Sequence, residues 1–597
     1  MSSAVQLYVS TLLIYLGVDI IAALALNLQF GVAGIVNFSF ILFQAVGAYV
    51  AAVLTLGPST PPPAGFQDYV LGATLPYPLP LIAAAGAGGL LSLAIGVVGL
   101  RRLRTDYQAM VLLVFSLIAT IVVTNETGLF NGSNGLSLVP KPLADVLGLS
   151  PYDIGYQWFF VGIVAVVCVM AYGVVHAITS SPLGRNLRAM RDNEHAATAL
   201  GKDVTRLRML AFVVGGALAA VSGALLVEFI SAWSPGSWFL PETFSFFAAV
   251  IVGGAGNNFG AIVGALLVPV AFLEATSFIP TFGRAGLVES LKWVAVGLLI
   301  MIFLAFWPRG IFPERRRRFR ASRTGAASYT PAPSPCFVRG TDQPVDSALL
   351  EARSLRREYG GVHAVEEASF TVPTGRITGL IGPNGAGKTT VLGMLAGAVA
   401  VSAGDVLYQG AVITRLAPHQ RAQRGLIRTF QQSSEFTNLS VLENLVVAVP
   451  RARGDGLAGA LLTKRYWRGQ QEAEVDRARA LLERFAMTPQ QDELAGSLSG
   501  GQRRLVEIMR ALMACPQLLL LDEPMAGVNP TLARRIEEHL ADLRADGLTM
   551  LMVEHELGVV DRLCDAVIVM ARGRVIAHGP MSTLRVNQDV LDAYLIG

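Results

Sequence analysis

The chain has 597 residues, a length that predicts at least two domains. Hydrophobic residues make up 53% of the sequence, charged residues only 15%, and the formal net charge is +4. Charged residues are sparse from Met1 to about Trp307 and dense from Glu314 onward. This asymmetry predicts a membrane domain followed by a soluble domain, and the small net charge argues against a nucleic-acid-binding protein.

Apolar stretches long enough to cross a bilayer recur through the first half, about nine in all. They lie near 8–28, 31–56, 80–100, 107–125, 157–178, 209–231, 243–256, 258–278 and 286–307. The seventh is short, and a re-entrant segment is the alternative to a full span there. The pattern predicts a polytopic α-helical membrane domain over residues 1–313.

Basic residues indicate the orientation of this domain, because Lys and Arg concentrate in cytoplasmic loops. They cluster at 101–104, 185–208 and 315–323, whereas loops 57–79 and 127–155 contain few. We expect the three basic loops inside and the other two outside, which fits nine spans with an outside N-terminus. The last cluster directly follows a span, so this rule explains it more simply than nucleic-acid binding.

Three acidic residues, Asp19, Glu228 and Glu274, lie inside predicted spans. Charges in a membrane are costly and usually face a cavity or a partner. Pairing at a subunit interface is the plainer interpretation, and contact with a substrate amine is the other.

The second half begins after a stretch rich in Ser, Thr, Ala, Pro and Gly, which predicts a flexible cytoplasmic linker over 314–347. From 348 to 597, short apolar runs alternate with helical stretches. That alternation predicts a soluble α/β domain.

A phosphate-binding loop is predicted directly after the apolar run Ile377–Ile381, with a helical stretch from Val391. The loop consists of Gly382, Pro383, Asn384, Gly385, Ala386, Gly387, Lys388, Thr389 and Thr390. Its glycines let backbone N–H groups wrap phosphates, and a helix N-terminus adds a positive dipole. We expect Lys388 to contact the β- and γ-phosphates and Thr389 to bind Mg²⁺, which makes ATP and Mg²⁺ the predicted cofactors.

Two adjacent carboxylates, Asp522 and Glu523, end the leucine run 518–521. An apolar run with acids only at its tip predicts a buried strand that delivers them to a ligand. Asp522 suits the Mg²⁺ shell, and Glu523 suits a general base that polarises the attacking water.

The sequence LSGGQ at Leu498–Gln502 lies between these two motifs and precedes a helix that runs to about Met513. With this signature, residues 349–597 resemble the ABC ATPases. Gln431 resembles the Q-loop glutamine, His555 the switch histidine and Tyr359 the aromatic residue that stacks on adenine.

The resemblance implies an α/β P-loop ATPase that hydrolyses ATP with Glu523, His555 and Gln431, and places Gln431 with Thr389 and Asp522 at the Mg²⁺ ion. It further implies nucleotide contacts from the signature residues Ser499, Gly500, Gly501 and Gln502. In this family two ATPase domains clamp two ATP molecules head to tail. A second ATPase subunit, or a second copy of this chain, is therefore expected.

More specific likenesses point to the branched-chain amino-acid group of ABC importers. The segment 526–530 (AGVNP) is similar to the AGLNP of LivG-type ATPases, as is the ending 592–597 (DAYLIG). In the first half, about 15–310 resembles LivM-type permeases on the stretches 27–38, 103–107 and 131–136. The basic segment 181–201 is similar to the part of such permeases that docks on the ATPase, and we expect it to act as a coupling helix.

Together, these resemblances predict an ATP-driven importer subunit of a bacterial inner membrane, with its ATPase domain in the cytoplasm. The resemblance implies an amino acid or a related amide as solute. It implies a second permease subunit and an extracytoplasmic substrate-binding protein as partners. The alternatives are an ABC exporter and a non-transporting ABC ATPase that transmits force or a signal.

Overall fold

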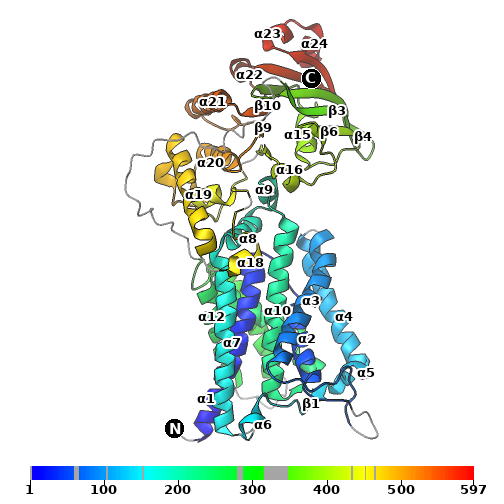
Figure 1. The fold of residues 1–597 in the computed structure, drawn as a ribbon, viewed down its shortest axis with the longest axis vertical. Helices are drawn as coiled ribbons and strands as arrows, with labels where there is room; N and C mark the ends of the chain where they lie inside the picture. Colours follow the sequence, from blue (N-terminus) through cyan, green and yellow to red (C-terminus); the bar gives the residue numbers. More distant parts are fainter. Residues whose placement is uncertain are drawn as a thin grey trace. The chain divides into compact units, whose positions relative to one another are not determined.

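The chain forms two compact units, Met1–Arg191 with Thr205–Arg315 and Asp192–Val204 with Arg316–Gly597 (Figure 1). The computed structural model describes residues 3–59, 66–102, 105–148, 150, 153–277, 287–314, 347–431, 434–450, 452–462 and 465–596. The predicted linker 314–347 lies outside the described residues except for its first and last positions.

The first unit is helical. Its α-helices are α1 (Ser3–Leu26), α2 (Phe40–Val53), α3 (Leu79–Arg102), α4 (Thr105–Asn125), α5 (Thr127–Phe130), α6 (Ala144–Leu147), α7 (Ile154–Ser180), α8 (Pro182–Asp192), α10 (Val204–Ile230), α11 (Leu240–Gly253), α12 (Asn258–Ala265), α13 (Leu273–Ser277) and α14 (Leu287–Phe306). It also contains π-helical η1 (Asn27–Val32) and η4 (Leu266–Phe272), 3₁₀-helical η2 (Gly132–Asn134) and η3 (Pro235–Ser237), and the short strands β1 (Leu136–Ser137) and β2 (Ala232–Trp233).

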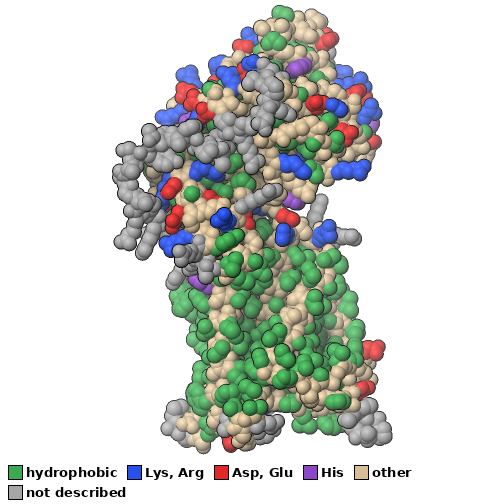
Figure 2. Space-filling model, viewed as in Figure 1, with side chains coloured by type: hydrophobic (Ala, Val, Ile, Leu, Met, Phe, Trp, Pro, Cys, Tyr) green, Lys and Arg blue, Asp and Glu red, His purple; other side chains and the backbone are tan. Residues whose placement is uncertain are grey.

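Within the described part of the chain, 7 helical segments are long and apolar enough to cross a membrane, and two shorter apolar helices accompany them. Together they correspond to the nine expected spans, which confirms the predicted polytopic helical domain. The short seventh stretch, for which a re-entrant segment was the alternative, is part of a longer segment, Pro235–Gly253, which is long enough to cross. On the face shown in Figure 2, hydrophobic side chains cover the band between the two ends of this unit.

The second span begins later than expected, at Phe40 instead of near 31. The chain leaves the helix after η1, and Gly34 adopts φ +72°, a conformation that disfavours other residues. Polar side chains stabilise this break: Asn37 Nδ2 donates to Gln29 Oε1 at 2.8 Å, and Gln29 Nε2 donates to the Phe212 carbonyl at 2.9 Å. Non-helical backbone is tolerated at membrane depth when protein groups satisfy it in this way.

The two loops expected outside lie together at one end of the first unit. Gln67 and Ser137 exchange two hydrogen bonds of 3.0 and 2.8 Å, and Tyr69 forms a β-bridge with Phe130. Strand β1 pairs with β2, which follows α10. This arrangement agrees with the expectation that both loops face the same side of the membrane.

The second unit contains a ten-stranded mixed sheet in the order β7-β6-β3-β4-β12-β11-β5-β10-β9-β8. The strands are β3 (Ala348–Tyr359), β4 (Val362–Pro373), β5 (Ile377–Ile381), β6 (Ala403–Tyr408), β7 (Ala411–Val412), β8 (Leu426–Arg428), β9 (Leu518–Asp522), β10 (Thr549–Val553), β11 (Ala566–Ala571) and β12 (Arg574–Gly579). Its helices are α9 (Glu194–Ala199), α15 (Lys388–Ala396), α16 (Pro418–Ala422), α17 (Val441–Val447), α18 (Leu457–Leu461), α19 (Arg465–Arg484), α20 (Gly500–Met513), α21 (Pro530–Ala545), α22 (Leu557–Leu563), α23 (Met581–Leu584), α24 (Gln588–Ile596) and the 3₁₀ turns η5 (Thr488–Gln490) and η6 (Ala495–Ser497).

The predicted α/β character of this unit is confirmed. Strands β5, β9 and β10 match the predicted runs and are buried along their whole length, as apolar central strands of a parallel sheet should be. The helix after the phosphate-binding loop begins at Lys388, three residues before the expected start at Val391, because the end of the loop itself forms the first turn.

Candidate nucleotide site

Four predicted site segments meet at one edge of the sheet. Strands β8, β9, β10 and β5 are adjacent and parallel, so their carboxyl ends lie side by side. The chain leaves these ends into Gln431, the Asp522–Glu523 pair, His555 and the loop 382–390, respectively. The crevice outside such strand ends is where open α/β sheets bind ligands.

The phosphate-binding loop connects β5 to α15 and places Lys388 in the first helical turn. Lys388 Nζ donates to the carbonyl oxygens of Gly382 at 2.8 Å and Pro383 at 3.0 Å. Burial lowers the pKa of Lys388, while the nearby carboxylates of Glu523 and Asp522 oppose that shift. The ammonium group is thus held at the loop, close to the two acids.

Gly387 explains why this loop needs glycine at its end. Its φ is +95°, and a Cβ built there would lie 2.6 Å from the carbonyl oxygen of Ala364 in β4. Any side chain would therefore push the loop away from the sheet. In the following turn, Thr389 is exposed and Thr390 half-buried.

Asp522 ends β9 and is almost fully buried, with 1% of its surface exposed. Its Oδ2 accepts a hydrogen bond from Arg428 Nη2 at 2.9 Å, whereas its Oδ1 has no hydrogen-bond partner among the described residues. A buried carboxylate oxygen without a protein partner suits a divalent cation, and Mg²⁺ prefers such oxygen ligands. Asp522 therefore fits the predicted ion, and Thr389 lies in the first turn of α15, at the end of the phosphate-binding loop.

Glu523 lies between the two predicted partner residues. Gln431 Nε2 donates to Glu523 Oε2 at 3.0 Å, and His555 Nε2 lies 2.9 Å from Glu523 Oε1. The Glu523 backbone adopts φ +47°, which non-glycine residues rarely do outside functional sites. All three residues predicted as catalytic thus come together around one carboxylate.

The signature residues and Tyr359 lie elsewhere in the ATPase unit. Among the described residues, they form no hydrogen bond with the cluster of Gln431, Glu523 and His555. Ser499 caps α20 in a capping box with Gln502, whose Oε1 accepts from the Ser499 backbone N at 3.0 Å. Gly500 and Gly501 form the first turn of α20, which ends at Met513 as predicted. Tyr359 ends β3 and is 47% exposed, with the Arg357 guanidinium 4.3 Å from its ring centroid.

Two further residues shape the site, and the sequence reasoning missed both. The buried Arg504 guanidinium donates to the Asp522 and Glu523 carbonyls at 2.6 and 2.5 Å and forms an ion pair with Glu507 at 2.6 Å. Glu554 accepts from the Met525 backbone N at 3.0 Å, and burial raises the pKa of Glu554. The spacing of Arg504 and Glu507 in the sequence could have indicated this ion pair, because an Arg and a Glu three residues apart on a helix can interact.

Residues 192–204 belong to the same unit as the ATPase sheet. Helix α9 contacts α16, and the segment is held by Gln423 Nε2 donating to the Gly201 carbonyl at 2.8 Å and Lys202 Nζ donating to the Val449 carbonyl at 2.9 Å. A small cavity of about 150 Å³ separates α9 from the β8 end, and Arg428 lines it. Arg428, which also binds Asp522, therefore lies in the wall of this cavity, as do residues of α9.

Comparison with known proteins assigns both halves. Residues 8–305 match the family "Branched-chain amino acid transport system / permease component", and residues 365–526 match the family "ABC transporter".

The ATPase half also has curated relatives. It is 36% identical over 247 residues to the "Probable branched-chain amino acid transport ATP-binding protein LivG" of Archaeoglobus fulgidus, covering 41% of this chain and 95% of the relative. It is 39% identical over 248 residues to the "Lipopolysaccharide export system ATP-binding protein LptB" of Escherichia coli, covering 42% and 97%. Escherichia coli LivG is 37% identical over 249 residues, covering 41% and 97%.

These matches account for both units of the fold and for the motifs at the sheet edge. The second half is an ATP-hydrolysing domain that binds ATP or ADP, and the first is a membrane permease domain. The chain therefore belongs to the ABC transporter family and joins a permease of the branched-chain amino-acid type to a LivG-like ATPase in one polypeptide.

Proposed function

We propose that this chain imports a small solute, an amino acid or a related amide, across the bacterial inner membrane at the expense of ATP. The observation that carries the proposal is the Glu523 carboxylate, held between Gln431 and His555 in a chain whose other half matches a branched-chain amino-acid permease. A hydrolytic site of this kind on a permease chain supports transport more directly than a signalling role.

In the proposed hydrolysis, the backbone of the loop 382–390 and Lys388 bind the phosphates. Lys388 must then exchange its hydrogen bonds with the Gly382 and Pro383 carbonyls for phosphate oxygens. Glu523 takes the proton of the attacking water, and Gln431 and His555 keep its carboxylate in place. Mg²⁺, held by Asp522 and Thr389 with the Gln431 amide oxygen, would neutralise charge on the phosphates.

The signature helix supports the expected pairing of two ATPase domains. Ser499 and Gly500 are exposed, and Ser499 bonds to the half-buried Gln502, so the start of α20 is accessible to a nucleotide bound elsewhere. We therefore propose a second ATPase subunit or a second copy of this chain as partner. A second permease and an extracytoplasmic binding protein complete the proposed importer.

The segment 192–204 is proposed to couple the two activities. Its contacts through Gly201 and Lys202 seat it in the ATPase unit, and Arg428 lies between it and Asp522. Because the segment continues directly into the span α10, a change at the site would move that span.

Export is the second candidate, since the ATPase half resembles LptB as closely as it resembles LivG. The permease match favours import. The test is ATP hydrolysis by the purified complex with a panel of secreted binding proteins, each with and without its ligand. Import predicts that one liganded protein raises hydrolysis and that E523Q abolishes the response. Hydrolysis that no binding protein changes would contradict import.

A further inference from the structure

A pocket of about 330 Å³ lies in the permease unit where α2 ends and α3 begins. One wall comes from Thr55 and the stretch 74–77, another from the loop 140–144, and the third from Glu228 in the last turn of α10. Three segments far apart in sequence thus enclose it. None of the site residues discussed above contributes to it.

Glu228 is the unusual member of this pocket. It is 1% exposed, and neither carboxylate oxygen has a hydrogen-bond partner among the described residues. Burying an ionised carboxylate without a partner is far more costly than burying a neutral polar group. Buried polar groups are nearly always satisfied, so an exception calls for a missing partner.

The other two acids predicted to lie inside spans differ from it. Glu274 Oε1 accepts a hydrogen bond from the Tyr8 hydroxyl at 2.9 Å, so its carboxylate already has a protein partner. Asp19, on α1, is half-buried and lines none of the pockets described for this unit. Of these three acids, Glu228 is the one that combines full burial with a place in a pocket wall.

Lys141 brings a positive charge to the same pocket. Its Nζ lies 5.5 Å from the Phe229 ring centroid and 5.8 Å from that of Tyr156, and burial lowers the pKa of Lys141. The rest of the lining is largely apolar and includes Leu75 and Leu143. The pocket therefore offers one acid, one base and an apolar wall.

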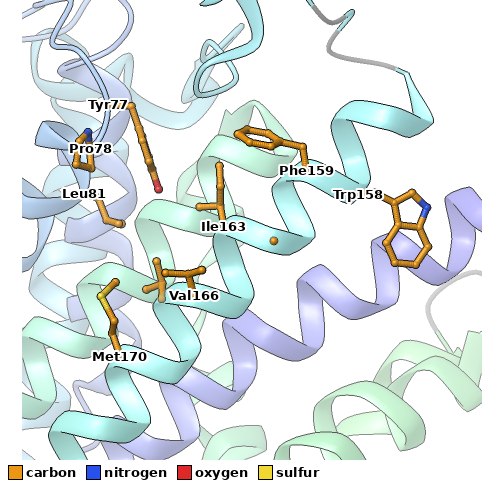
Figure 3. Close-up of a pocket in the computed structure, with 10 residues that line it drawn as sticks. Tyr77, Pro78, Leu81, Trp158, Phe159, Ile163, Val166 and Met170 are labelled. Carbon is orange, nitrogen blue, oxygen red and sulfur yellow. The ribbon is translucent and has the colours of Figure 1, made fainter. Parts of the chain in front are cut away.

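A neighbouring groove shows the contrast. It measures about 530 Å³ and runs along α7, with Tyr77 as a wall that it shares with the Glu228 pocket (Figure 3). Its lining side chains include Leu81, Ile163 and Met170, and none is charged. Of these two pockets, the Glu228 pocket is the one lined by charged side chains and therefore the one suited to a charged solute.

We propose that the Glu228 pocket binds the primary ammonium group of a small solute with an apolar body, and that Lys141 receives a carboxylate of the same solute. This inference rests on the proposed function and names its solute chemistry. Both Glu228 oxygens are shielded from water, so a side chain of the wall must move before the ammonium group reaches them. Glu228 lies 24 residues after Val204 on α10, about 36 Å along the helix, which places the pocket at the outer end of this span.

The test is protection of Glu228 from dicyclohexylcarbodiimide, which modifies buried protonated carboxyls. The full chain is placed in nanodiscs of phosphatidylcholine, which has no primary amine, and peptide mass spectrometry measures all modification of Glu228, both the carbodiimide adduct and any amide formed with an amine probe. The probes are L-leucine, 3-methylbutylamine, 4-methylpentanoate and 4-methylpentanamide. E228Q identifies the labelled site, and E274Q is the matched control.

We expect L-leucine and 3-methylbutylamine to protect Glu228 and the other two probes to leave it reactive, with E274Q unchanged. K141A should weaken protection by L-leucine about tenfold while leaving that by 3-methylbutylamine intact, because an ion-assisted hydrogen bond is lost. Equal protection by 4-methylpentanamide, or none by either amine, would overturn the proposal. So would protection that appears only in phosphatidylethanolamine nanodiscs, which would assign the site to a lipid headgroup. Stimulation of ATP hydrolysis by a liganded binding protein tests transport separately and would stand if this pocket assignment failed.

Discussion

At the tip of β9, two adjacent carboxylates have different surroundings. Asp522 is buried against Arg428 with one oxygen left for a ligand, whereas Glu523 is held between the side chains of Gln431 and His555. The first environment suits a metal ion and the second suits proton transfer. The Glu523 backbone adopts φ +47°, so the chain changes direction directly after the end of β9.

The change E523Q should lower ATP hydrolysis by at least about 100-fold, because the glutamine amide cannot take the proton of the attacking water. ATP affinity should stay near that of the unmodified complex, since the loop 382–390 is intact. Phosphate release and binding of a fluorescent ATP analogue measure the two effects. K388A is the converse control and should lose affinity; turnover of E523Q at the normal rate would refute the assignment.

Arg504 should be essential as a positioning residue. R504A leaves Glu507 buried without its ion-pair partner and removes the hydrogen bonds to the Asp522 and Glu523 carbonyls. The free energy of unfolding should fall by about 3–5 kcal/mol. We expect a lower temperature of half-inactivation and little hydrolysis. R468A, on the surface of α19, removes an exposed ion pair with Glu472 and should cost at most about 1 kcal/mol. Equal behaviour of the two variants would show that these hydrogen bonds do not organise the site.

At the scale of elements, α9 is the feature whose placement matters most. It is a helix of 6 residues capped by Asn193, whose side chain accepts a hydrogen bond from the Ala196 backbone N. Asp192 before it accepts two hydrogen bonds from Asn438, at 2.8 and 3.0 Å. Contacts on both sides of the helix therefore fix it in the ATPase unit, although it lies between two permease segments in the sequence.

A substitution at Gly201 tests whether the segment 192–204 couples ATP hydrolysis to transport. It adopts φ +83°, and a Cβ there would lie 3.2 Å from Gln423 Cγ. G201W should displace the segment, and we expect normal basal hydrolysis with loss of both uptake and stimulation by the binding protein. G469W, at an exposed glycine of α19 with open space around it, is the matched control. Normal coupled uptake by correctly folded G201W would exclude the coupling role.

Strongly patterned elements were predictable from the sequence, whereas features set by contacts across the fold were not. Strand β9 is four leucines and an acid, so burial and the ligand edge follow from the pattern alone. The break before α2 depends on the Gln29 and Asn37 hydrogen bonds, which join residues that no periodicity relates. Likewise, the hydrogen bonds of Arg504 go to the backbone of Phe430, Asp522 and Glu523, which its own helix pattern does not indicate.

In the whole molecule, the proposed importer has loops 57–79 and 127–155 outside the membrane and its ATPase domain in the cytoplasm. Val146 on α6 is 81% exposed in the loop region expected outside, and Val586 in the ATPase unit is 80% exposed. In a cysteine-free background, V146C should react with a membrane-impermeant maleimide in intact cells. V586C should react only after the membrane is opened. Labelling of both from outside would invert the proposed topology.

Directional transport is the central claim, and one measurement addresses it. The complex is reconstituted into liposomes with its binding protein outside, and ATP is either trapped in the lumen or added outside. Trapped ATP drives only those molecules whose ATPase domains face the lumen. The account predicts that radiolabelled amino acid accumulates in the lumen with trapped ATP, and that complexes carrying E523Q accumulate none. Accumulation only when ATP is added outside would mean that the chain exports its solute, and would contradict the account.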